Sequence, residues 1–294
     1  MNDHDSDCLI NTRIRPNNDF AFSGPLHFAS ALFVFCAVLF AFPTFVETIS
    51  GSSSALVPFV ILILGFSLIP DLDNTQSTAK SAVAGGGILS EVFQLTSLMW
   101  QQLVHTRRDD DLNNPHRKLW HTPFCWLVVA ILVTFLSSTH FFQFSTPGFW
   151  KLPSYSFNSG KLVIFLLLFL AAQVALAGIE KTILSSKKKS LGLTVLKTVL
   201  AAAIGLLGVV NLPINMSTLW VGAGVLGGAW IHILGDWFTT QGVPLLHPIP
   251  YKGRMWWMFR LTKIKSGGAL EPILSAVFII VSVLLIAVTC FPHH

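Results

Sequence analysis

The chain has 294 residues, of which 52% are hydrophobic and only 11% carry a charged side chain. A soluble domain carries about 25% charged residues, so this composition excludes a single water-soluble core and favours a protein built in lipid. The net charge of +5 does not indicate nucleic-acid binding, because the basic residues follow the loop pattern described below. The four cysteines show no C-x-x-C spacing, which argues against a disulfide framework or a cysteine zinc site.

Hydrophobic segments dominate the chain after a polar start. Residues 1–20 are expected to form a cytosolic tail, and residues 21–294 a single integral membrane domain. Apolar segments close to the ~20 residues that cross a bilayer follow at about 28–45, 52–69, 123–139, 162–184, 191–212, 216–234 and 272–290. They predict an all-α, polytopic transmembrane bundle with about seven spans, within a range of six to eight. The mildly apolar stretch 81–104 holds glycines, glutamines and a glutamate, and we expect a cytoplasmic or interfacial helix there.

Basic residues in the short loops predict the orientation of this bundle. If the N-terminus is cytoplasmic, the inner segments hold most of the lysines and arginines, including Lys187–Lys189, and the outer loops hold Lys151 and Lys161. Cytoplasmic loops of membrane proteins are enriched in both residue types. The pattern therefore predicts a cytoplasmic N-terminus, and it explains the basic run by topology, with no nucleic-acid partner expected.

Histidines, acidic residues and one arginine recur where the predicted spans begin or end on the cytoplasmic side. Such groups are costly near a membrane and indicate function by default. They are His27, Asp71, Asp73, His116, Arg117, His121, His232, Asp236 and Glu271. Because the predicted orientation brings these helix ends to one face, we expect residues far apart in the chain to meet in one layer.

The spacing of these residues suits metal coordination. His232 and Asp236 are four apart and would share one face of a helix. His116 and His121 precede the Thr-Pro pair at 122–123, which is typical of an N-cap followed by proline at the first helical position. Both histidines can therefore lie in the turn before that helix. Imidazole and carboxylate without thiolate suit zinc, manganese or iron.

Five motifs carry a family resemblance. They are GPLHF with His27, PDLDNTQS with Asp71, HRKLWHT with His116, HILGDWFTTQGVPLLHP with His232, and FRLTKIKSGGALEP with Glu271. In this order they resemble the YdjM-like family of inner-membrane metal-dependent hydrolases, and the fourth motif is the most specific.

The chain departs from this pattern in two places. The family usually has HRGxTHS, where this chain has Lys118 for the glycine, Trp120 for the threonine and Thr122 for the serine. Both histidines and the arginine are kept, so the departure concerns the shape of the loop more than metal binding. The two predicted spans at about 140–215 look like an insertion beyond the shorter family pattern.

The resemblance implies a multi-pass enzyme of the cell inner membrane that uses one or more divalent ions, zinc first and manganese or iron as alternatives. The expected metal ligands are His27, Asp71, His116, His121, His232 and Asp236. Asp73 would be a further ligand or the general base, Arg117 would stabilise an anionic substrate, and Glu271 would orient a ligand histidine. A more distant similarity to the zinc-dependent phospholipases C implies a phosphoester substrate, such as a lipid headgroup, and the bilayer is the expected partner.

Three alternatives stay open at this point. The same cluster could be an ion or proton relay of a transporter, although transporter sites usually lie near the midplane of the bilayer. The chain could also be a membrane scaffold without catalytic activity. An aspartyl intramembrane protease using Asp71 and Asp236 would leave four histidines unexplained, and the sequence has neither HExxH nor G-x-S-x-G.

Overall fold

The structure, a computed structural model, describes residues 24–74, 77, 79–80, 86–109, 116–146, 155–183, 191–213, 216–262 and 270–290. The predicted tail at 1–20 and the basic run Lys187–Lys189 lie outside these residues. The cytoplasmic orientation of the N-terminus stays a prediction.

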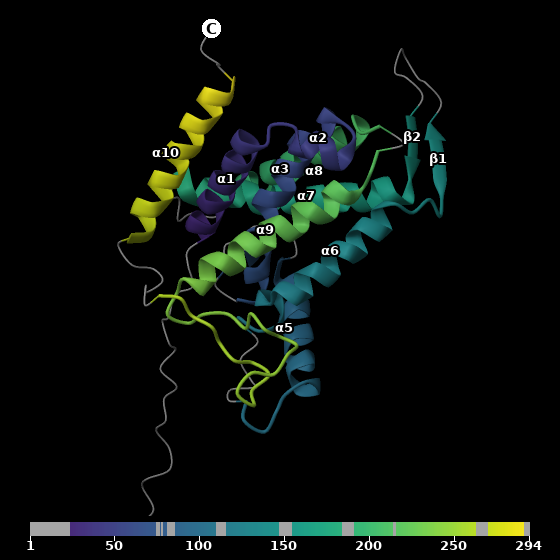
Figure 1. The fold of residues 1–294 in the computed structure, drawn as a ribbon. Coiled ribbons are helices and arrows are strands. Elements are labelled where there is room, and N and C mark those ends of the chain that lie inside the picture. The colour runs from purple at the N-terminus through teal and green to yellow at the C-terminus, as the bar shows by residue number, and fades with distance from the viewer. Residues whose placement is uncertain are drawn as a thin grey trace, which may run out of the picture.

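The described chain is helical apart from one short pair of strands (Figure 1). The helices are α1 (Gly24–Ala41), α2 (Phe45–Ser50), α3 (Leu56–Phe66), α5 (Gly86–Leu103), α6 (Pro123–Ser137), α7 (Ser159–Ile183), α8 (Leu191–Val210), α9 (Leu219–Trp237) and α10 (Leu270–Cys290). The 3-10 turns are η1 (Ser53–Ala55), η2 (Ile69–Asp73) and η3 (Leu119–His121). Strands β1 (Gln143–Thr146) and β2 (Tyr155–Asn158) pair antiparallel with Gln143 opposite Asn158.

The predicted membrane fold is confirmed in the described residues. Six segments are long and apolar enough to cross a bilayer: Gly24–Ala41, Ser53–Asp73, Ser159–Lys181, Gly192–Val210, Leu219–Trp237 and Leu270–Thr289. The predicted span at 123–139 is α6, whose 15 residues rise only about 22 Å, less than the ~30 Å hydrocarbon layer. The stretch 81–104 forms the expected helix, α5, whereas the strands were not predicted, because four-residue strands carry too short a pattern.

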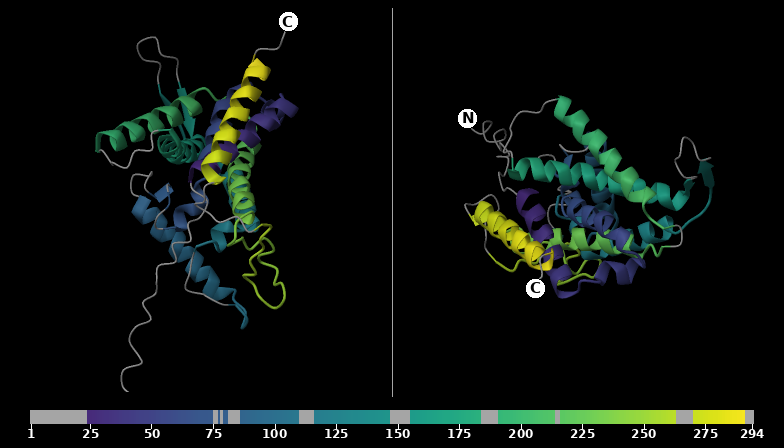
Figure 2. Two further views of the ribbon diagram at one scale, coloured as in Figure 1. Left: turned by 90° about the vertical axis from the view of Figure 1, so that its left-hand side faces the viewer. Right: turned by 90° about the horizontal axis from the view of Figure 1, so that it is seen from above.

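Helices α3 and α9 form the centre of the bundle. Helix α9 packs against α3 and α6, and α3 also packs against α7. Helices α7 and α8 lie on one side of this centre and α10, which packs on α1, lies on the other (Figure 2). A Cβ at Gly228 would lie 2.5 Å from the carbonyl oxygen of Ile63, so the absence of a side chain lets α9 approach α3 closely. This close contact brings the end of α9 beside η2.

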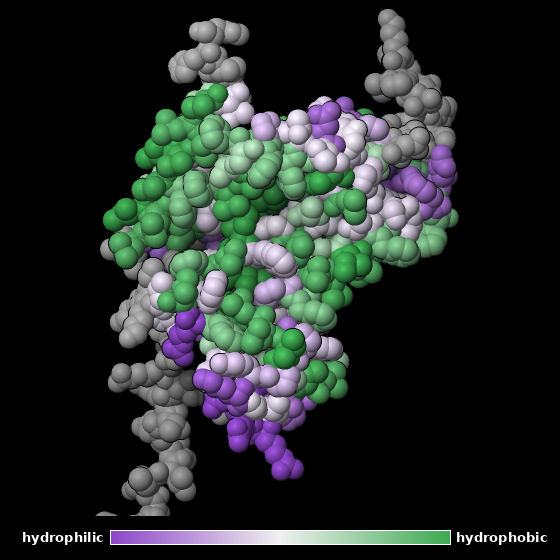
Figure 3. Space-filling view, viewed as in Figure 1, coloured by the Kyte–Doolittle hydropathy of each residue, from purple (hydrophilic) through white to green (hydrophobic). Residues whose placement is uncertain are grey.

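The outer surface is largely apolar, as lipid contact requires. Helix α10 exposes one stripe of large apolar side chains: Ile273, Val277, Ile280, Leu284 and Val288. Figure 3 shows hydrophobic residues covering this side, whereas hydrophilic residues gather at the far end of the projection that α5 and the segment 243–262 form. The sides of the bundle are therefore largely apolar, and its polar side chains lie inside and toward its ends.

Candidate metal centre

The histidines and aspartates singled out in the sequence meet at one end of the bundle. His27 comes from the first turn of α1, Asp71 and Asp73 come from η2, and His121 ends η3. The last turns of α9 supply the remaining pair, His232 and Asp236. All six side chains are buried, with at most 6% of each residue exposed to solvent.

Local structure explains how the short segments present these groups. Pro70 lies in the first turn of η2 and Asn74 closes this turn by donating its amide to the Asp71 carbonyl. Before α6, the Thr122 hydroxyl accepts the amide of Cys125, and Pro123 follows at the first helical position. This is the predicted N-cap. It ends the preceding turn so that His121 points inward.

Four atoms of this cluster lie within 4.8 Å of one another. They are Asp71 Oδ1, His121 Nε2, His232 Nε2 and Asp236 Oδ2.

The two imidazole nitrogens are 3.2 Å apart, and Asp236 Oδ2 lies 3.3 Å from His121 and 3.5 Å from His232. Asp71 Oδ1 lies 3.6 Å and 3.5 Å from the same two nitrogens. Zinc bonded tetrahedrally to nitrogen and oxygen at about 2.0–2.1 Å separates its ligands by about 3.3 Å. These five separations therefore match those between the ligands of a tetrahedral metal site.

The bonds behind the imidazoles decide which nitrogen faces the centre. His232 Nδ1 lies 2.8 Å from the carbonyl oxygen of Ser67, and since a carbonyl can only accept, this nitrogen carries the proton. His121 Nδ1 lies 3.5 Å from Asp73 Oδ2, an ion-pair contact that is too long for a hydrogen bond, and the nearby negative charge favours the same tautomer. Both Nε2 lone pairs then point inward. Asp71 Oδ1 and Asp236 Oδ2 are buried without a hydrogen-bond partner in the described residues, so four electron-rich atoms converge on one point.

Charge balance gives a second reason for a cation. Three buried carboxylates and one buried guanidinium leave two net negative charges when the histidines are neutral. Burial lowers the pKa of His121, but Asp73, Asp236 and Asp71 outweigh it and leave this pKa well above its usual value. The carboxylates that favour a proton on His121 also attract a metal ion, and one divalent ion would neutralise the two net negative charges. The residues present therefore fit a divalent metal.

His27 and Arg117 both contact the outer oxygen of Asp236. Arg117 Nη2 lies 2.9 Å and His27 Nε2 3.6 Å from Asp236 Oδ1. The His27 ring also stacks on His232, with centroids 3.9 Å apart. These contacts place His27 at the edge of the four-donor group, where it is available as a fifth ligand or as a support for Asp236.

Arg117 is directed into the protein, where the sequence had suggested a substrate contact. Its Nη1 donates to the Thr239 hydroxyl at 2.6 Å, and Thr239 in turn donates to the Asp236 carbonyl. The backbone of Arg117 has φ 58°, a left-handed conformation that costs free energy for a residue with a side chain. The geometry therefore gives Arg117 a positioning role toward Asp236.

The turn after α9 supports this arrangement. Gly242 has φ 73°, and a Cβ there would lie 2.2 Å from the Phe259 carbonyl oxygen. Val243 and Phe259 exchange backbone hydrogen bonds beside it. This close approach folds the segment 243–262 back beneath the centre.

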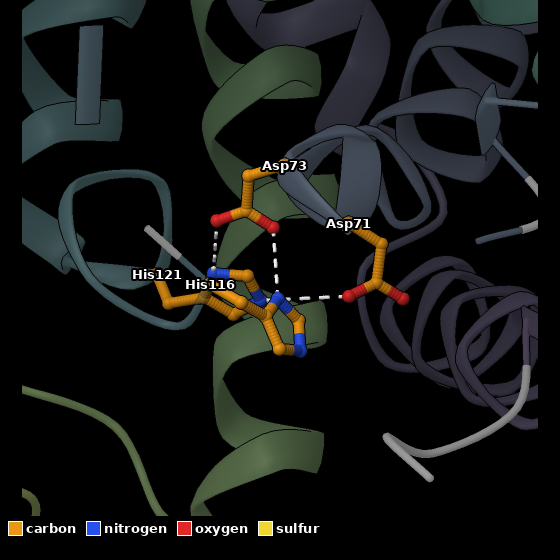
Figure 4. Close-up of side chains that lie close together, drawn as sticks. All are labelled: Asp71, Asp73, His116 and His121. Carbon is orange, nitrogen blue, oxygen red and sulfur yellow. Dashed lines mark hydrogen bonds and ion pairs between the residues drawn. The ribbon is translucent and has the colours of Figure 1, made fainter. Parts of the chain in front are cut away.

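Asp73 and His116 form a second part of the cluster (Figure 4). His116 Nδ1 lies 2.9 Å from Asp73 Oδ1, and its side chain is 21% exposed, far more than the other members. In Figure 4 both imidazoles lie on one side of Asp73, which directs one oxygen toward each, and His121 also faces Asp71. Asp71, Asp73, His116 and His121 could also group around an ion, so the structure offers two overlapping sets of ligands.

Glu271 comes from α10, the helix that packs on α1, whose first turn carries His27. It is buried in the first turn of α10. Its suggested role in orienting a ligand histidine stays a prediction.

Two polar residues make contacts in the segment 243–262 that the sequence does not indicate. His247 is 3% exposed, stacks on Trp256 at 4.2 Å and accepts a hydrogen bond from the Trp100 indole. Asp109, in the loop after α5, accepts the amides of Met255 and Trp256. His247 is buried despite its polarity because its ring stacks on Trp256. The sequence spacing of these residues indicates neither this contact nor that of Asp109.

Fold and site together define a multi-pass membrane protein with a buried histidine and aspartate cluster that could hold a metal ion. Residues 190–292 match the family model of the YdjM inner membrane protein, which confirms the predicted resemblance over this range and the location in the inner membrane. The match contains His232, Asp236 and Glu271 and begins inside the segment 140–215, whose status as an insertion stays a prediction. No curated protein and no solved structure matches the chain.

Proposed function

We propose that this chain is a membrane-embedded, metal-dependent hydrolase that acts on a phosphoester of phospholipid type. The observation that carries the proposal is the convergence of four buried donor atoms from η2, η3 and α9, in which each imidazole nitrogen lies 3.2–3.6 Å from the other three atoms. Zinc is the first candidate because these separations are those of its tetrahedral shell, with manganese and iron as alternatives for the same donor types. A bound ion of this kind supplies Lewis acidity and lowers the pKa of water.

The chain's own residues supply the positioning and a path for protons. Asp73 holds the back of His121, and Arg117 holds the outer oxygen of Asp236. His116 is the most exposed member of the cluster and bonds to Asp73 through Nδ1, so a proton that this imidazole exchanges moves at Nε2. A partly exposed histidine beside a buried carboxylate suits general acid and base catalysis.

Helix α5 supports a lipid as the substrate. It packs against η2 and η3, the two turns that carry Asp71, Asp73 and His121. Its outward stripe is apolar, namely Ile88, Val92, Leu95, Met99 and Leu103, whereas Ser90, Ser97 and Gln101 are buried. A helix with an apolar outer face suits the surface of a bilayer. Acyl chains could then lie along α5 while the headgroup reaches the cluster.

The presence of four donor atoms also favours a second candidate function, a membrane scaffold with a structural metal site. Catalytic zinc sites usually keep one position open, whereas four protein ligands close a structural site. A scaffold whose helix ends are held together by a closed metal site would use the same geometry. The hydrolase requires at least one further coordination position, for water or substrate.

Metal analysis with substitutions separates these candidates. Tag-free protein in detergent should contain about one equivalent of metal, and His232→Ala should lose it, whereas His105→Ala, at an exposed histidine of the same type, should keep it. Absence of metal in the wild type would refute both candidates. The visible spectrum of the cobalt-substituted protein should show five or six ligands for the hydrolase and four for the scaffold.

Activity is measured on the same preparations. Phosphomonoester, phosphodiester and phospholipid substrates should include one that the wild type cleaves and His232→Ala does not. A metal-loaded protein that cleaves none of them and is four-coordinate would contradict the hydrolase and support the scaffold. Substrate flux into proteoliposomes without a hydrolysis product would instead indicate a transporter.

A further inference from the structure

The end of the bundle opposite the metal centre contains a pocket. Its volume is about 500 Å³, within the usual range for small-molecule sites. The C-terminal end of α6, the start of α7 and the residues before α9 line it, beside the base of β2 (Figure 1). The length of α6, about 22 Å, separates this pocket from His121. The two sites are therefore independent.

The polar side chains that line the pocket are one lysine and several uncharged hydrogen-bonding groups. Lys161 and Ser137 are 7% and 4% exposed, respectively, and both line the pocket. His140 and Asn158 lie there too, joined at 2.7 Å between Nδ1 and Nδ2. None of the described residues that line this pocket is acidic. A positive side chain among hydroxyl and amide groups favours an anion as the ligand.

Two further features point to an anion. The Ser137 hydroxyl oxygen is buried without a hydrogen-bond partner in the described residues, and an unsatisfied buried hydroxyl costs free energy unless a ligand bonds to it. Lys161 also lies in the first turn of α7, where the helix dipole adds positive potential. The amides of Ser159, Gly160 and Lys161 already bond within the protein, so side chains would make the contacts.

We propose that this pocket binds the phosphate group of an anionic lipid headgroup or of a small phosphate ester. Phosphate suits this lining because its several oxygens accept hydrogen bonds from ammonium and hydroxyl groups, which Lys161 and Ser137 supply. Ile164, Leu212 and Met216 form an apolar wall, which suits the glycerol or acyl part of a lipid. The ligand is distinct from the substrate of the metal centre, and the proposal does not depend on the hydrolase.

The test measures phosphate binding to the full chain in nanodiscs of phosphatidylcholine, with EDTA present so that the metal centre does not contribute. Wild type should bind inorganic phosphate, and Lys161→Gln should bind it at least about tenfold more weakly, as expected for losing one charge-assisted hydrogen bond. Lys161→Arg keeps the charge and should stay within about threefold of wild type. Lys252→Gln, at an exposed lysine in the segment 243–262, should leave binding unchanged.

A second arm separates the lipid from the free ester. Native mass spectrometry should detect one retained phosphatidylglycerol in wild type and fewer in Lys161→Gln if the source is a lipid, whereas binding of soluble phosphate alone would identify the ester. Ser137→Ala removes only a hydroxyl and should weaken the binding of phosphate and of phosphatidylglycerol. It keeps the test valid if Lys161→Gln misfolds. Absence of binding in wild type, or equal binding in wild type and both neutral variants, would overturn the proposal.

Discussion

Asp73 is the residue whose role the geometry defines most sharply, because it lies behind the four donors and does not belong to them. One carboxylate oxygen lies 3.5 Å from His121 Nδ1 and the other 2.9 Å from His116 Nδ1. The sequence left open whether Asp73 is a ligand or a general base, and both roles stay predictions. Its position behind His121 adds a third role, that of a group that orients His121 and strengthens its Nε2 as a ligand.

Asp73→Asn keeps the shape of the side chain and removes one negative charge. The four donors remain, so the protein should still bind one metal ion. The loss of a partner behind a ligand histidine typically weakens metal affinity 10- to 100-fold, or about 1.4–2.7 kcal/mol. Removal of a donor, as in His232→Ala, should instead abolish stoichiometric binding. The two outcomes therefore differ in kind as well as in size.

The assay is a competition titration between the purified protein and a chromophoric zinc chelator in detergent. Glu91→Gln is the matched control, because Glu91 is an exposed carboxylate on α5, and it should bind zinc like wild type. Complete loss of metal in Asp73→Asn would show that Asp73 is a ligand. An unchanged affinity would refute the argument that the carboxylate supports His121.

Three other predictions follow from contacts near the centre. Arg117→Met leaves Asp236 buried without its guanidinium, and the free energy of unfolding of the metal-free protein should fall by about 3–5 kcal/mol, measured by denaturant titration in detergent; an unchanged value would contradict the positioning role. Gly242→Ala places a Cβ 2.2 Å from a carbonyl oxygen at φ 73°. It should lower the free energy of unfolding by about 1–3 kcal/mol, which a lower midpoint of thermal unfolding would detect. A midpoint equal to wild type would show that the turn is less constrained than its geometry indicates. Burial lowers the pKa of His247 from its ordinary value of 6.5 to about 4, so between pH 6.5 and 4 the unfolded segment binds more protons than the folded one. The stability of the folded segment should therefore fall as the pH falls through this window. Hydrogen exchange in 243–262 would detect this loss, and His247→Gln should remove the pH dependence.

Much of the candidate site could be predicted because helix ends are marked locally. The Thr-Pro pair at 122–123 caps α6 as expected. His232 and Asp236 share a face of α9, and their atoms are 3.5 Å apart. Hydrophobic length alone predicted most of the spans. These features depend on neighbours within a few residues, so the sequence is sufficient to predict them.

Other parts of the site could not be predicted in this way. The proton position on His232 depends on a backbone carbonyl, that of Ser67, and a carbonyl has no signature in a sequence. Arg117 turns toward Asp236 because α9 lies beside it, although its chemistry also suits a phosphate. His247 is buried because Trp256 folds over it. Each of these contacts joins segments separated by many residues.

Composition, hydrophobic period and capping residues determined that this chain forms a bundle of membrane helices with ligand-type side chains near the ends of several of them. Tertiary structure alone decided which of these side chains share a centre, with Asp71, His121, His232 and Asp236 together and His116 at the edge. The physical reason is that helix formation depends on hydrogen bonds between near neighbours. A metal site, in contrast, requires atoms to approach within about 3–4 Å, and only the packing of α9 against α3 and η2 sets those distances.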